Sequence, residues 1–196
     1  MPDRRPESVL RTDARRNVER IRTAAVEVFR TEGFSAPLEN VAAVARVSKA
    51  TIFNRFGGRV GLIDAVIDEV VAKELRGIID EARSVSDIRE RVRFYVGAIR
   101  DIQYRLPAVN DVLLQAFPGS EPLMGLCTAG GAFHESLVKD GHAAGVLAEG
   151  FTPSDFQALT IDNSIALKYG TLPSKTSYDR RTAFVLNGIC EPAGGG

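Results

Sequence analysis

The sequence predicts an all-α protein with two domains, a three-helix unit at residues 1–60 and a larger helical bundle at residues 61–196. Apolar residues recur every three or four positions along most of the chain, which is the spacing of one helix face. No segment alternates apolar and polar residues as a half-buried strand does. Glycines and prolines interrupt the apolar pattern and so mark where each helix should end.

The first 60 residues predict three helices. Apolar spacing indicates a first helix from about residue 13, which Gly33 ends in the manner of a glycine that follows a helix C-terminus. Pro37 suits the first position of a short second helix, and Ser48 is a good N-cap for a third helix over about 49–55. Two short helices joined by a few residues match the helix-turn-helix, whose second helix enters the major groove of DNA.

The rest of the chain predicts a bundle of longer helices. The first of these, over about 59–83, carries a continuous apolar stripe and would be about 36 Å long, enough to join the two domains. The other expected helices lie at about 86–106, between Pro107 and Pro118, and at about 121–144, 154–169 and 178–189. Residues 191–196 end in three glycines and are expected to fray.

The charges divide unevenly along the chain. Residues 1–60 contain 12 Lys and Arg against 7 Asp and Glu, a net charge of +5, whereas residues 61–196 contain 13 against 18, a net charge of −5. A basic end on an acidic body suggests a polyanion partner at that end. No apolar run approaches the roughly 18 to 20 residues of a membrane span, and the N-terminus lacks the apolar core of a secretory signal. The two cysteines, Cys127 and Cys190, suit a reducing cytoplasm.

Catalytic and metal-binding patterns are missing from the sequence. It contains no HExxH, P-loop, GxGxxG or GxSxG motif, and two histidines with two cysteines leave little material for a metal site. We therefore expect no enzymatic activity, no cofactor and no metal. An enzyme built on a helical bundle remains one alternative, although the lack of paired Glu-x-x-His ligands argues against the di-metal kind. The other alternative is a helical interaction or ligand-binding module without DNA binding.

Residues of the three-helix unit recur at a characteristic spacing, namely Ala24-Ala25, Phe29, Gly33-Phe34, Val41-Ala42, Val47-Ser48, Thr51-Ile52-Phe53, Phe56, Arg59 and Leu62. In this pattern the chain resembles the DNA-binding domain of the TetR family of repressors. Residues 11–17 and 35–42 look most like the SbtR-like branch, which residues 143–155 also resemble weakly. The resemblance implies a homodimeric, cytoplasmic repressor that binds a pseudo-palindromic operator in double-stranded DNA and is released by a small-molecule effector.

The resemblance also implies which residues meet DNA. Lys49 and Ala50 should face base edges, because a lysine donates to guanine O6/N7 and a methyl group meets the thymine methyl. Ser48 should cap the recognition helix, whose N-terminus favours a phosphate. The complete set expected at the interface is Arg15, Arg16, Arg22, Arg46, Ser48, Lys49, Ala50, Thr51, Phe53, Asn54, Arg55 and Arg59.

The sequence departs from the family pattern at four of these positions. Arg46 stands where the turn usually has glycine, so a left-handed backbone there would cost about 1 kcal/mol. Ala50 also replaces a glycine. Phe53 replaces a tyrosine whose hydroxyl commonly reaches a phosphate, and Arg55 replaces a frequent histidine and can compensate with its charge.

For the second domain the resemblance implies a small-molecule pocket among the helices. The candidate lining residues are Tyr95, Ile99, Ile102, Leu113, Phe117, Met124, Cys127, Phe133, His134 and Asn163. Gly125, Gly130 and Gly131 fall in one predicted helix and either permit close helix packing or leave room for a ligand. Asn163 lies on an otherwise apolar face. It is either a buried amide whose hydrogen bonds are satisfied within the protein or a polar anchor for a ligand or a dimer partner.

In the family, the last two helices pair across a dimer. Here they carry apolar residues that would form a four-helix interface around a two-fold axis. These residues are Phe156, Leu159, Leu167, Phe184, Leu186 and Ile189.

Overall fold

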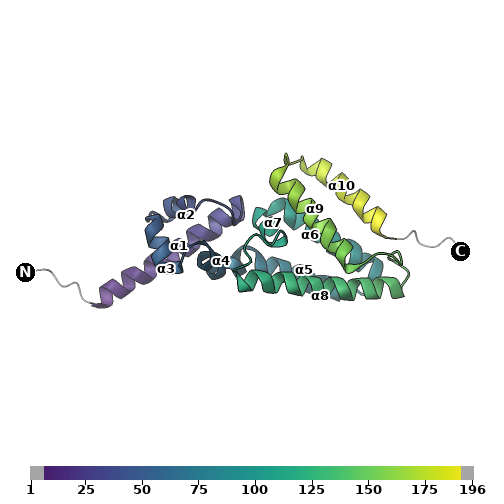
Figure 1. Ribbon diagram of the computed structural model, residues 1–196, viewed down its shortest axis with the longest axis horizontal. Helices are drawn as coiled ribbons and strands as arrows, with labels where there is room; N and C mark the ends of the chain where they lie inside the picture. Colours follow the sequence, from purple (N-terminus) through teal and green to yellow (C-terminus); the bar gives the residue numbers. More distant parts are fainter. Residues whose placement is uncertain (1–6, 191–196) are drawn as a thin grey trace, which may run out of the picture.

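The computed structural model describes residues 7–190, with side chains from Arg15 onward, and most of this range is helical. The described part contains no strand, and a single isolated bridge pairs Leu147 with Cys190. The molecule is elongated, with α1, α2 and α3 at one end and the helices of the bundle at the other (Figure 1). The predicted all-α fold class is confirmed.

The N-terminal unit consists of α1 (Glu7–Glu32), α2 (Leu38–Ala45) and α3 (Lys49–Phe56). Its core is made of side chains with no exposed surface, namely Ile21, Phe29, Phe34, Val41 and Ile52. The rings of Phe29 and Phe34 pack in a T-shaped, edge-to-face arrangement with their centroids 5.4 Å apart. Ile52 is the only buried residue of α3, so the remainder of that helix stays at the surface.

One helical run leads from this unit into the bundle, through α4 (Arg59–Ile67), η1 (Asp68–Ala72) and α5 (Lys73–Ser84). The predicted long helix therefore has the right extent, but apolar spacing did not predict the π-helical turn η1. Arg30 of α1 donates to the carbonyl oxygens of Glu69 and Val70 in this turn, at 2.9 and 3.2 Å. The same guanidinium pairs with Glu74 at 2.6 Å, which ties the turn to α1.

The bundle is completed by α6 (Ile88–Arg105), α7 (Pro107–Leu113), α8 (Glu121–Ala143), α9 (Pro153–Tyr169) and α10 (Lys175–Ile189). In Figure 1, α8 runs along the lower edge while α9 and α10 lie on the upper side. Helix α9 packs against α6, α7 and α8, and α10 packs against α6. Helix α7 also contacts α1, so the bundle touches the N-terminal unit directly.

A buried polar network joins α6, α9 and α10. Asn163 donates to Gln103 Oε1 and to the Tyr178 hydroxyl, both at 2.8 Å. Gln103 in turn donates to Ser164 Oγ at 2.8 Å, and the Tyr178 hydroxyl donates to the Arg100 carbonyl oxygen at 2.7 Å. Asn163 is thus a satisfied buried amide, which decides between the two alternatives left open by the sequence.

Several helix boundaries differ from those predicted. Helix α1 begins at Glu7 rather than near residue 13. Helix α10 begins at Lys175 rather than near 178, because its first three residues are polar and carry no apolar signal. Pro37 is the N-cap of α2, with φ −56° and ψ 135°, and the helix begins one residue later. The fraying predicted for residues 191–196 lies outside the described residues.

Candidate DNA interface and effector cavity

Helix α3 presents the surface that the sequence assigns to DNA. Ser48 caps it, as predicted, by accepting a hydrogen bond from the Thr51 amide at 3.1 Å. Ile52 anchors the inner face, and Thr51 is half-buried. The residues of α3 that are exposed are Lys49, Ala50, Phe53, Asn54 and Arg55.

The turn before α3 contains the left-handed residue that the family pattern implied. Arg46 has φ 53° and ψ 48°, a conformation that costs a non-glycine residue about 1 kcal/mol. Its side chain is exposed and lines a shallow hollow between α1 and α2 together with Arg15 and Arg16. Three of the expected cations therefore gather beside the turn, where they would attract phosphates of any sequence.

Lys49 is held by an ion pair at the start of α3. Its ammonium lies 2.6 Å from Glu39 Oε1, and this hydrogen bond lowers the pKa of the Glu39 carboxyl. Both side chains are exposed, and exposed ion pairs are weak. Lys49 can therefore leave Glu39 for a base edge at small cost.

Two further residues among the predicted DNA contacts are engaged within the protein. Arg59 donates to the carbonyl oxygens of Phe34 and Ala36, at 2.7 and 2.5 Å. Arg22 pairs with Glu69 at 2.7 Å. Arg59 therefore joins the start of α4 to the turn between α1 and α2. The sequence did not predict this role, because the position of backbone acceptors depends on the fold.

We expect Arg59→Ala to lower the stability of the fold. Charge-assisted hydrogen bonds contribute roughly 1.5–3 kcal/mol, and this substitution removes two of them. Thermal denaturation should show a clear fall in the melting temperature, whereas Arg55→Ala, at an exposed site on α3, should leave it within error. If the melting temperature is unchanged and affinity falls equally for all DNA sequences, Arg59 binds phosphate and does not stabilise the fold.

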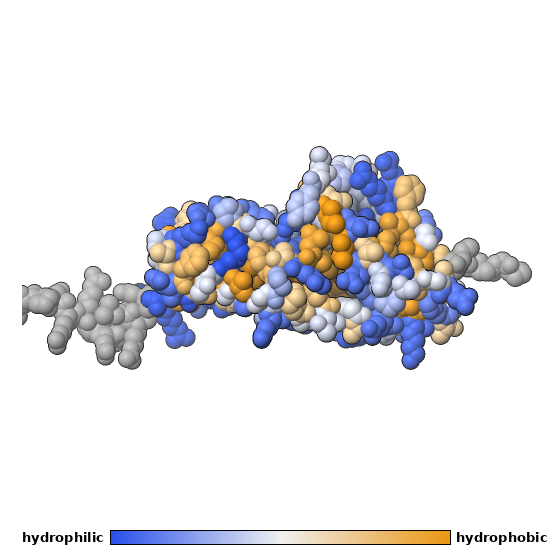
Figure 2. Space-filling view, viewed as in Figure 1, coloured by the Kyte–Doolittle hydropathy of each residue, from blue (hydrophilic) through white to orange (hydrophobic). Residues whose placement is uncertain are grey.

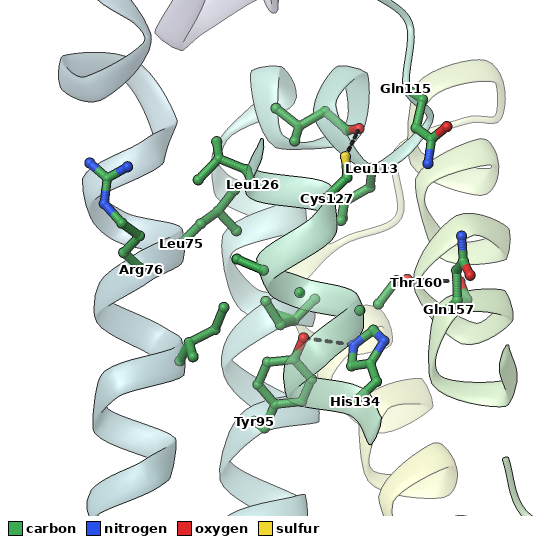
Figure 3. Close-up of a pocket in the computed structure, with 16 residues that line it drawn as sticks. Leu75, Arg76, Tyr95, Leu113, Gln115, Leu126, Cys127, His134, Gln157 and Thr160 are labelled. Atoms are coloured by element: carbon green, nitrogen blue, oxygen red, sulfur yellow. Dashed lines mark hydrogen bonds between the residues drawn. The ribbon is translucent and has the colours of Figure 1, made fainter. Parts of the chain in front are cut away.

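A cavity of about 120 Å³ lies in the bundle, lined mainly by apolar residues of α5, α6, α7 and α8, with Gln157 and Thr160 of α9 on one side (Figure 3). Five of the ten predicted ligand-binding residues line it, namely Tyr95, Ile99, Leu113, Cys127 and His134. The other five do not, namely Ile102, Phe117, Met124, Phe133 and Asn163. Ile102 is fully buried one turn beyond Ile99, and Phe117 packs instead on Phe34.

Most of the remaining lining could not be chosen from the sequence. It consists of Leu75, Arg76, Ile79, Val112, Gln115, Leu126, Ala129, Gly130, Gly131, Gln157 and Thr160. Leu75 and Ile79 lie in the apolar stripe of the long helix, which is common to any packed helix and does not distinguish a pocket. Figure 3 shows the Arg76 guanidinium turned away from the cavity, where it pairs with Asp68 at 2.6 Å.

The glycines of α8 leave room rather than permit close packing. A Cβ added at Gly125, Gly130 or Gly131 would meet no other part of the protein within 4 Å. Gly130 and Gly131 line the cavity, so their missing side chains widen it. Close approach occurs further along the same helix, where a Cβ at Gly141 would lie 2.6 Å from Leu147.

An uncharged hydrogen-bonded pair forms the polar end of the cavity. The Tyr95 hydroxyl lies 2.8 Å from His134 Nε2, as the dashed line in Figure 3 marks. Burial lowers the pKa of His134 to about 4 and raises the pKa of Tyr95, so both groups are neutral near pH 7. Burial also raises the pKa of Cys127, whose thiol donates to the Val112 carbonyl oxygen at 3.5 Å.

The burial of His134 predicts a loss of stability in acid. The unfolded chain binds a proton to this histidine near pH 6.5, whereas the folded chain does so only near pH 4. The stability associated with the neutral imidazole is therefore complete above pH 6.5 and is lost progressively as the pH falls toward 4. Urea denaturation at pH 7.5 and pH 5 should show a larger loss for the native chain than for His134→Gln, and equal losses would contradict this assignment.

The residues predicted for dimerisation differ in their exposure. Phe156 has 1% of its surface exposed and packs in the protomer core against Tyr95 and Phe151. Phe184 of α10 is 67% exposed, while the other predicted residues, Leu159, Leu167, Leu186 and Ile189, are half-buried. The exposed apolar side chains that the prediction omitted are Ile165, Tyr169 and Leu172. Figure 2 shows apolar surface on the bundle where Figure 1 places α9 and α10.

No three His, Cys, Asp or Glu side chains come together in the described part of the chain in a way that would hold a metal ion. None of the helices in that part combines the length and the apolar character that crossing a membrane requires.

Comparisons with known proteins agree with this architecture. Residues 21–66 match the sequence model for bacterial regulatory proteins of the tetR family. No curated protein matches the sequence. Among solved structures, a tetR-family regulatory protein from Rhodococcus RHA1 is similar, with a TM-score of 0.64 and 18% identity over 90% of this chain and 98% of its own.

Two other solved structures have the same fold. The ketosteroid transcriptional regulator KstR2 of Mycobacterium tuberculosis has a TM-score of 0.63 and 13% identity, over 90% of this chain and 96% of its own. The fatty acid degradation regulator FadR of Bacillus halodurans has a TM-score of 0.60 and 15% identity, over 88% and 95%. Residues 21–66 therefore match the tetR family of bacterial regulatory proteins, and the chain has the fold of the solved regulators.

Proposed function

We propose that this protein is a homodimeric repressor that binds a pseudo-palindromic operator and releases it when a small molecule fills the cavity of the bundle. Residues 1–60 would act as the DNA-binding domain, and residues 61–196 would bind the effector and form the dimer. The repressor would act in the cytoplasm. Within the family we place it in the SbtR-like branch, which residues 11–17 and 35–42 resemble. The observation that carries the proposal is the presence, in one chain, of an exposed recognition helix and a partly enclosed apolar cavity.

The chemistry of α3 supports DNA binding with sequence preference. Its N-terminal turn offers Lys49 and Ala50, a donor and a methyl group, in the position from which a recognition helix reaches base edges. The exposed arginines Arg15, Arg16 and Arg46 supply attraction to the phosphates on either side. Specific and non-specific contributions thus come from different residues, which allows them to be tested separately.

The cavity favours an uncharged and largely apolar effector. A charged group would lose its hydration against largely apolar walls, and the polar side chains it would meet there, Tyr95, His134, Gln115, Gln157 and Thr160, are all uncharged. Apolar cavities of about 150 Å³ hold a molecule the size of benzene, so about 120 Å³ accommodates a small ring or a short branched chain. Two regulators of the same fold are described by apolar compounds, KstR2 as a ketosteroid transcriptional regulator and FadR as a fatty acid degradation regulator.

A selection experiment tests the proposed function. The purified protein should enrich, from random duplex DNA, a motif repeated with two-fold symmetry and with half-sites about 34–36 Å apart. Small uncharged compounds that raise the melting temperature of the protein should then displace it from that duplex. If no sequence is enriched while such compounds still bind, the chain is a ligand-binding module without DNA binding.

A further inference from the structure

We propose that Asp111 is a positioning residue that couples the cavity to the helix-turn-helix. Asp111 lies on α7, directly before the cavity-lining residues Val112 and Leu113, and 2% of its side chain is exposed. Its carboxylate is bound by groups from the turn between α1 and α2 and from α9. This inference rests on the proposed function, since it concerns how occupancy of the cavity reaches α3.

Every hydrogen-bonding partner of this carboxylate is a donor from a distant part of the chain. Oδ2 accepts from the amides of Phe34 and Ser35, at 2.7 and 3.3 Å. Oδ1 accepts from Ser35 Oγ at 2.8 Å and pairs with the ammonium of Lys168 on α9. Lys168 also donates to Ser35 Oγ at 2.9 Å, which closes a small network around the turn. We call Asp111, Lys168 and Ser35 with the Phe34 amide the Asp111 cluster.

The turn between α1 and α2 is shaped to receive this carboxylate. Gly33 has φ +85°, and a Cβ there would lie 2.7 Å from Asp111 Oδ2, so only glycine permits the approach. Phe34 is fully buried, with its ring against that of Phe117 in the segment after α7. The contact is therefore specific to one placement of the turn against α7.

The same turn controls both helices that flank α3. Helix α2 begins just after it, and Arg59 at the first position of α4 donates to the Phe34 and Ala36 carbonyl oxygens. A displacement of the turn would therefore move the start of α2 and the start of α4 together. Because α3 lies between these helices in the chain and packs on α4, its orientation would change with them.

Both helices that supply the cluster also form walls of the cavity. On α7, Val112 and Leu113 face the cavity, and on α9, Gln157 and Thr160 do so. A molecule that pushes α7 or α9 outward would separate Asp111 from Lys168 or from the turn. We expect the contacts of the Asp111 carboxylate to break as a unit, because a buried carboxylate that keeps only some of its partners is costly in the interior.

The test uses a substitution that fills the cavity in place of the unidentified effector. Gly130→Leu places a side chain into the open space of the cavity, and Gly125→Leu on the same helix is its control, because Gly125 is exposed and does not line the cavity. Each is combined with Asp111→Asn. An asparagine amide cannot replace the carboxylate, since both oxygens face donors.

Hydrogen exchange of the Phe34 and Ser35 amides gives a readout that is independent of DNA. Gly130→Leu should speed exchange at this turn by about tenfold, whereas Gly125→Leu should not. Asp111→Asn should speed it to a similar degree, and Gly130→Leu should then add nothing, which is the mark of a shared pathway. Ser35→Ala, at an exposed site, serves as a milder second variant if Asp111→Asn fails to fold.

Affinity for the selected duplex should follow the same pattern, with a loss of about tenfold for Gly130→Leu and for Asp111→Asn but no further loss when they are combined. If Asp111 only stabilises the fold, Asp111→Asn should lower stability, and Gly130→Leu should still change amide exchange and DNA affinity by its full amount in the Asp111→Asn background. That result would overturn the proposal. So would unchanged exchange at the turn in Gly130→Leu. If the native chain binds no DNA, the proposed function fails, but the exchange data still decide whether the cavity and the turn are coupled.

Discussion

Phe184→Asp should convert the protein to a monomer and reduce its affinity for a palindromic duplex by about 10²- to 10⁴-fold. Phe184 is 67% exposed on α10, and with Ile165, Tyr169 and Leu172 it leaves a group of large apolar side chains uncovered on α9, on α10 and between them. A carboxylate placed at the centre of a two-fold interface would face its own copy across the axis. The DNA effect follows because each monomer can hold only one half-site.

Light scattering decides the oligomeric state of this variant. Ala132→Asp is the matched control, because it adds the same charge at an exposed position of α8, away from the α9 and α10 surface. It should remain dimeric and bind DNA normally. A dimeric Phe184→Asp together with a monomeric Ala132→Asp would place the interface on α8 instead.

Lys49→Ala should weaken binding to the selected duplex by about tenfold and relax the preference at one position in each half-site. The reason is that a direct contact with a base edge discriminates among sequences, whereas a phosphate contact does not. Repeating the selection with the variant measures this directly. An unchanged motif would show that Lys49 does not read a base.

Arg16→Ala provides the contrast for Lys49→Ala. Arg16 is exposed on α1 beside the hollow that Arg46 lines, far from the N-terminus of α3 in sequence. Its loss should weaken binding to all duplexes equally and leave the selected motif unchanged. Together the two variants separate sequence reading from general attraction to the DNA backbone.

The N-terminal unit was predictable because its determinants are local. Gly33 ends α1 with a positive φ, and Ser48 caps α3 through a residue three positions away. Such signals depend on neighbours in sequence and so can be recognised without knowledge of packing. The left-handed conformation of Arg46 is the condition that the sequence raised for a turn position usually held by glycine.

The cavity and the Asp111 cluster were not predictable in the same way. Tyr95 and Ile99 line the cavity while Ile102 does not, although all three share the apolar face of α6. Which part of an apolar face is left without a partner depends on the placement of α5, α8 and α9, and this is set by contacts distant in sequence. Asp111 bonds to a turn 76 and 77 residues away, so no local pattern marks it.

The central claim is that two copies of this chain bind one operator through the basic surface around α3. Within the described residues, the predicted DNA contacts of each chain include four exposed arginines, Arg15, Arg16, Arg46 and Arg55, so a dimer can neutralise about eight phosphates. Fluorescence anisotropy with the selected duplex, repeated from about 50 to 200 mM salt, should give two chains per duplex and a slope of log K against log salt near −7. One chain per duplex, or an affinity that does not change with salt, would contradict the account.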